Sequence, residues 1–126
     1  MAQRTTYPIE SPRTSVQVLH AHFTGAGAAN GTLDAQEALN GEIVSATWSS
    51  TGVYALVFRH AYPELKGAPI CSFIATTGGL DGQCSAIDVT AKTATLKIYA
   101  GTTLTDLTTN DTVYLTWAVR NSGKNK

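Results

Sequence analysis

One pattern repeats along the sequence from residue 42 onward: a run of seven to nine residues rich in Val, Ile, Thr, Tyr and Trp, followed by a short turn-forming stretch. Branched and aromatic side chains fit a pleated sheet, and runs of this length are typical of strands. The 19 threonines among 126 residues favour the same state, because branching at Cβ restricts the side chain in a helix. The expected strands are 15–23, 42–48, 53–60, 70–76, 84–90, 93–100 and 112–120, with turns at 49–52, 63–69, 77–82, 91–92 and 101–111. The chain therefore predicts an all-β fold.

The last of these runs shows the alternation most clearly. Burying its odd-numbered face would contribute roughly 1.5 to 3 kcal/mol per large side chain. The members of that face are Val113, Leu115, Trp117 and Val119. In the run 53–60 both faces are apolar up to Phe58, so both are expected to be largely covered. Seven or eight strands of this kind predict a β-sandwich or jelly roll.

The size and composition of the chain bound the number of domains. With 126 residues, 43% of them hydrophobic, the chain can bury one core, and a second core is not expected. We place a single β-domain at residues 15–121, an extended N-terminal arm at 1–14 and a basic polar tail at 122–126. Residues 34–40 could form two helical turns closed by Gly41.

The arm at 1–14 has neither helical nor strand periodicity. Pro8 and Pro12 fix their own φ and disfavour helix in the residues before them, so the segment is expected to be extended. Such an arm is either disordered or ordered against another surface. Because Tyr7 and Ile9 are apolar, we favour a docked arm.

Charge and hydropathy limit the expected partners. Nine basic residues balance nine acidic ones, so no overall field draws the protein to nucleic acid or to an acidic membrane. No apolar run approaches the roughly 18 residues that a membrane-spanning helix needs. The polar start of the chain lacks the apolar region of a signal peptide, and we expect a soluble protein made in a cytoplasm.

The two cysteines, Cys71 and Cys84, flank a Gly-rich stretch that could place both thiols on neighbouring strands. A disulfide is therefore geometrically possible. A reducing cytoplasm argues against it, and we favour two free thiols that pack as small apolar residues. A metal or catalytic role is the least expected, because the pair lacks the short spacing of zinc ligands.

No arrangement of residues indicates catalysis or a cofactor. His20 and His22 share one strand face, and only His60 could complete a metal triad, without a carboxylate at a ligand spacing. No nucleophile elbow or phosphate-binding loop is present, so we expect neither an enzyme nor a cofactor. Arg59 and His60 follow an apolar strand, and we interpret them as facing solvent or a neighbouring subunit rather than as a catalytic pair.

Three segments resemble small virion proteins of tailed bacteriophages: STGVYALVF with the following YPEL, AIDVTAKTATLKIYAG, and DTVYLTWAVRNS. The resemblance covers roughly residues 43–122, and the size and arm look most like a capsid decoration (cement) protein. It implies a homo-oligomer, expected to be a trimer, that binds the major capsid protein on the outer face of the shell and stabilises it. The protein would then reside in the virion after assembly in the host cytoplasm, without direct contact with nucleic acid or membrane.

Under this resemblance, the arm is the expected contact with a neighbouring subunit or with the major capsid protein. Tyr7 and Ile9 would be apolar anchors, and Arg4 and Arg13 would pair with carboxylates.

Two other functions stay open. The loop 25–40 could serve host attachment in a tail or head-fibre component. A carbohydrate-binding β-sandwich is the other alternative, although its aromatic side chains should be exposed. The aromatic residues available for that role are mostly on apolar-patterned strands: Trp48, Tyr54, Tyr62, Tyr99 and Trp117.

Overall fold

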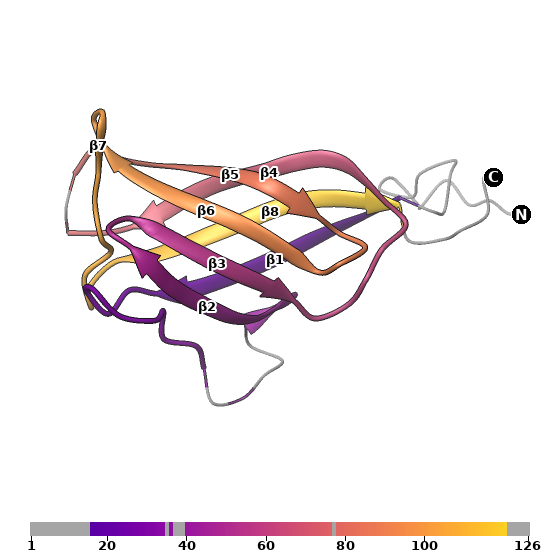
Figure 1. Cartoon of the computed structure of the whole chain (residues 1–126), viewed down its shortest axis with the longest axis horizontal. Coiled ribbons are helices and arrows are strands. Elements are labelled where there is room, and N and C mark those ends of the chain that lie inside the picture. The colour runs from indigo at the N-terminus through magenta and orange to yellow at the C-terminus, as the bar shows by residue number, and fades with distance from the viewer. Residues whose placement is uncertain (1–15, 35, 37–39, 77, 121–126) are drawn as a thin grey trace, which may run out of the picture.

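The computed structural model describes residues 16–34, 36, 40–76 and 78–120. These residues form eight strands in two antiparallel sheets and no α-helix, as the sequence predicted for the fold class (Figure 1). None of them forms a helix long and apolar enough to span a membrane. The strands are β1 (Val16–Thr24), β2 (Ile43–Ser50), β3 (Val53–Phe58), β4 (Glu64–Ile74), β5 (Leu80–Asp88), β6 (Thr93–Ala100), β7 (Thr103–Leu104) and β8 (Thr112–Arg120).

The sheets have the strand orders β1-β8-β4 and β2-β3-β6-β5, and the short β7 pairs with β6. Their inner faces meet through aromatic contacts. Phe23 of β1 lies against Tyr54 of β3, with ring centroids 5.4 Å apart, and Trp117 of β8 stacks on Phe58 of β3 at 5.1 Å. The odd-numbered face of β8 is buried, as its alternation predicted. Alternate residues of β1, β3 and β6 complete the core, among them Ala21, Leu56, Leu96 and Ile98.

The two sheets are joined differently along their two sides. On the β1–β2 side, isolated bridges connect Ala21 with Gly41 and Thr24 with Thr32. On the other side β4 and β5 lie next to each other, but the residues that the structure describes there form no β-pairing between them. The fold is therefore bridged along one side and open along the other.

Several strand boundaries differ from the expected ones. β4 begins at Glu64, within the stretch 63–69 that we expected to be a turn, and β5 begins at Leu80, within the expected turn 77–82. Pro69 is tolerated because β4 is an edge strand whose register against β8 shifts between Gly67 and Ile70. β7 lies in the expected turn 101–111, and β3 ends at Phe58 instead of residue 60.

The prediction that both faces of β3 are covered was wrong. Tyr54, Leu56 and Phe58 are buried. On the opposite face, Ala55 is exposed and Val53 and Val57 are only partly buried. No layer of the described structure covers the outer face of this sheet. The apolar residues there are small or branched and tolerate that position in a pleated sheet.

Some predictions fall outside the described residues. They are the arm at 1–14, with Arg4, Tyr7, Ile9 and Arg13, the tail at 122–126, and most of the helical turns expected at 34–40.

Buried polar groups fix the loop between β7 and β8. The Tyr54 hydroxyl accepts a hydrogen bond from Leu107 N at 3.0 Å. Asp111, which is buried, accepts hydrogen bonds from Thr108 N at 2.9 Å and from Thr76 N at 3.2 Å. These hydrogen bonds offset the free-energy cost of removing from water backbone groups that the loop would otherwise leave unpaired.

Tyr54 should make the protein sensitive to alkali. Burial raises the pKa of this phenol above its ordinary value of 10.0. Well below pH 10.0 the phenol is neutral in both the folded and the unfolded state. As the pH rises through that value, the unfolded chain ionises first and the free energy of unfolding falls. Urea unfolding from about pH 8 to about pH 11 should show this loss of stability. Tyr54→Phe should reduce the pH dependence, at a cost of about 1 kcal/mol at neutral pH. An unchanged slope in the variant would contradict this assignment.

Candidate functional site

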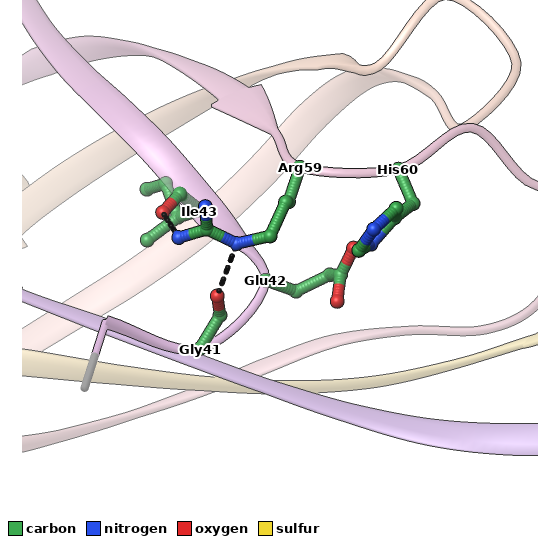
Figure 2. A network of polar contacts seen from close by, with 5 residues as sticks. All are labelled: Gly41, Glu42, Ile43, Arg59 and His60. Carbon is green, nitrogen blue, oxygen red and sulfur yellow. Dashed lines mark hydrogen bonds and ion pairs between the residues drawn. The ribbon is translucent and has the colours of Figure 1, made fainter. Parts of the chain in front are cut away.

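The expected contact residues Arg59 and His60 lie just after β3, at the corner where the chain enters β2 (Figure 2). Arg59 turns back onto its own fold. Its Nε donates to Gly41 O at 3.1 Å and its Nη2 donates to Ile43 O at 3.3 Å, while its backbone N donates to Glu42 O at 2.6 Å. The guanidinium thus holds two carbonyls at the start of β2.

The same corner reaches the edge of β1. Glu42 N donates to His20 O at 2.8 Å, and a Cβ added at Gly41 would lie 2.1 Å from that oxygen. Gly41 also has φ near 72°, so only glycine fits both the close approach and the backbone conformation. Arg59 is therefore a positioning residue that holds β2 against β1.

His60 lies on the outer side of the corner. Its Nδ1 is 2.6 Å from Glu42 Oε2, and its side chain is 62% exposed, whereas that of Glu42 is 13% exposed. Tyr62 also hydrogen-bonds to Glu42. Burial, the charge of Glu42 and this hydrogen bond raise the pKa of Tyr62 above its ordinary value. The Glu42 carboxylate, which also interacts with Tyr62, orients the exposed imidazole of His60. An exposed and oriented imidazole can make a polar contact with another molecule.

Sequence reasoning singled out Arg59 and His60 as residues facing solvent or a neighbour, but it did not predict that Arg59 binds its own backbone. It also missed Gly41, Glu42 and Tyr62, which complete the corner. The signal for Gly41 was a glycine immediately before a strand. The role of Glu42 had no such signal, because its partner His60 is 18 residues away.

A second candidate surface is the outer face of the sheet β1-β8-β4, which we call the β1-β8-β4 face. Strand register places its side chains in rows. Five of them are exposed large apolar or aromatic residues: Val16 at 36%, Val18 at 57%, Ile70 at 73%, Ile74 at 65% and Tyr114 at 37%. The rows run Val18–Ala118–Gly67, His20–Thr116–Ile70, His22–Tyr114–Ser72 and Thr24–Thr112–Ile74.

The histidines of β1 belong to this face. His22 packs against Tyr114, with ring centroids 5.3 Å apart, and His20 Nδ1 lies 3.3 Å from Thr116 Oγ1. His60 lies instead at the β2–β3 corner, paired with Glu42. Across the described ranges, no group of three or more His, Cys, Asp or Glu could hold a metal ion.

Charged residues gather at one end of the β1-β8-β4 face, where β1 begins and β8 ends. Glu64 Oε1 lies 3.4 Å from Lys66 Nζ and 3.1 Å from Arg120 Nε, the latter an ion pair without hydrogen-bond alignment. The four rows beyond this end carry neither carboxylates nor Lys or Arg.

The outer face of the other sheet is different. Its side chains are mostly small or polar, with Lys97 and Asp81 among them, and its one exposed large apolar side chain among the described residues is Val44 at 43%. Two rows of aligned residues cross it. One row is Thr47–Ala55–Thr95–Ser85 and the other is Val53–Lys97–Gln83. Among the described residues, the β1-β8-β4 face carries more exposed large apolar side chains than this face does.

The aromatic residues considered for glycan binding do not form an exposed platform. Tyr54 and Trp117 are buried in the core. Trp48 is partly buried, and its Nε1 donates to Asp106 at 2.8 Å. Tyr62 lies in the Glu42 corner, and Tyr99 lies across from Asp81.

Replacing Arg59 and His60 one at a time should show which of the two stabilises the fold. Arg59→Ala should lower the free energy of unfolding by roughly 1.5 to 3 kcal/mol, because two partly buried carbonyls lose a charged donor. His60→Ala should change it by less than about 1 kcal/mol, because the ion pair is exposed on one side. Urea unfolding of both variants measures the difference. Equal losses would show that Arg59 does not hold the corner.

We found no match for this chain among protein-family models, curated proteins or solved structures.

Proposed function

We propose that this chain is a structural virion protein of a tailed bacteriophage, a capsid decoration protein that assembles with copies of itself and stabilises the major capsid shell. The observation that carries the proposal is the exposed apolar β1-β8-β4 face. Exposed apolar surface of this kind is typical of protein–protein contact sites. We assign the two packed sheets to the β-sandwich class, and jelly-roll connectivity stays a prediction.

The composition of the β1-β8-β4 face supports contact with protein rather than with a charged polymer. Its central rows combine Val, Ile, Ala and Tyr with Thr, Ser and His, and the charged residues lie at one end. The core of a protein interface is likewise depleted in charge and contains aromatic residues. Two copies could approach through such a face without bringing like charges together.

The size of the face indicates that it does not act alone. Three strands about 4.8 Å apart and nine residues long, at about 3.3 Å per residue, span an area of about 400 Å². A stable interface needs about 800 Å² per partner. The arm could supply the rest, because Val16, where β1 begins, pairs with Arg120 at one end of this face (Figure 1). This is consistent with Arg4, Tyr7, Ile9 and Arg13 as contact residues.

A charge placed on the face should disrupt assembly. We expect the unaltered chain to be an oligomer by native mass measurement and to bind shells of the major capsid protein. Ile70→Glu should shift the mass to that of the monomer and weaken shell binding at least about tenfold, because a buried unpaired carboxylate is costly. Ser85→Glu, at an exposed position of the edge strand β5, is the matched control and should change neither. Normal assembly of the Ile70 variant would contradict the proposed surface.

Deleting residues 1–14 tests the arm separately. We expect the truncated protein to lose binding to shells, because it lacks both apolar anchors and both arginines, while far-ultraviolet circular dichroism still shows the β-domain. Full occupancy of shells by the truncated protein would show that the arm is not the contact.

A further inference from the structure

The open side of the fold brings the edge strands of the two sheets together. β4 is the outermost strand of one sheet and β5 of the other, and they lie next to each other along the upper side of Figure 1. Neither strand contributes a fully buried residue. Partly buried side chains from both strands pack against the core here, among them Cys71, Phe73, Cys84 and Ile87. The side chains on this side are therefore less buried than those in the rest of the described core.

The two cysteines face each other across this gap. Cys71 lies opposite Leu115 on β8, and Cys84 lies opposite Leu96 on β6; both of these leucines are core residues. Both thiols therefore project toward the space between the sheets.

Gly82 brings the two strands close at this point. A Cβ added at Gly82 would lie 2.8 Å from Cys71 Sγ and 3.0 Å from Cys71 Cβ, so the Cys71 side chain occupies the space above the glycine backbone. Cys84 projects from the same face of β5 two residues further along. Close approach of the two strands thus depends on glycine at this position.

The thiols also interact chemically. Both thiols are free, which agrees with the expectation of two free thiols, and they are close enough to shift each other's pKa. The hydrogen bond from Cys84 lowers the pKa of Cys71, whereas the same contact and burial raise the pKa of Cys84. Cys71 is therefore the thiol that ionises first, with Cys84 as its donor. A thiolate beside a second thiol is the arrangement that thiol–disulfide exchange requires.

We infer that Cys71 and Cys84 are a redox-active pair that closes into a disulfide when the protein meets a small-molecule disulfide such as oxidised glutathione, joining the two sheets along their open side.

In the first step the Cys71 thiolate attacks one sulfur of the oxidant, forming a mixed disulfide and releasing one molecule of reduced glutathione. In the second step Cys84 loses its proton and attacks the Cys71 sulfur, releasing the second molecule. Two protein thiols are oxidised and one glutathione disulfide is reduced to two thiols. The inference does not rest on the proposed function, since it concerns the fold alone.

The bond would enclose the twelve residues between Cys71 and Cys84. A disulfide around a loop of this length restricts the unfolded chain, so the oxidised protein should melt roughly 10 °C higher than the reduced protein.

The experiment incubates the purified full chain with oxidised glutathione and reads intact mass, alkylatable thiols and melting temperature. We expect a loss of two hydrogens in mass, no thiol that reacts without reduction, a monomeric band on non-reducing gels and the higher melting temperature. A reductant should reverse all four.

Two serine variants test the assigned roles. Cys84→Ser should stop at a single glutathione adduct on Cys71, because no second thiol resolves it. Cys71→Ser should react more slowly, because burial still raises the pKa of the remaining thiol of Cys84. Neither variant should gain the higher melting temperature with the oxidant. Two alkylatable thiols after prolonged oxidation of the unaltered chain, or disulfide-linked dimers instead of an internal bond, would overturn the inference.

Discussion

The packing of one apolar face of each sheet against the other is the interaction on which the rest of this structure depends. Phe23 against Tyr54, and Trp117 against Phe58, join strands that are distant in the sequence and belong to different sheets. Each such ring buries a large apolar area, and loss of one would leave a cavity that the sheets cannot close independently. The loops, corners and outer faces take their positions from this contact.

Polar groups then fix the connections that the core leaves at its edges. Asp111 and Arg59 act at different connections by the same principle, since each charged side chain binds two backbone groups. Asp106 does the same for Gly52 N while it also binds the indole of Trp48. These residues look like surface charges in the sequence, yet they hold the turns in register.

The outer faces of the two sheets differ in composition. One sheet presents small and polar residues outward, and the other presents the apolar β1-β8-β4 face, with the start of β1 at its end. The proposed assembly uses this asymmetry, because most of the exposed large apolar side chains of the described residues lie on the β1-β8-β4 face. The Cys71–Cys84 side is a separate feature, which bears on the cohesion of the two sheets rather than on partner binding.

The sequence by itself determined the all-β class, the bounds of β6 and β8, and the buried face of β8, because strict alternation over a whole strand depends on local chemistry alone. It could not place the start of β4, because Pro63 and Pro69 indicate a turn in the sequence. In the structure, pairing with β8 holds this segment in a strand despite the two prolines. It also could not show that Arg59 binds its own backbone or that Cys71 meets Cys84. The Arg59 contact depends on the pairing of β2 with β3, and the Cys71 contact depends on the packing of one sheet on the other. Both join residues that are distant in the sequence, so only the tertiary structure decides them.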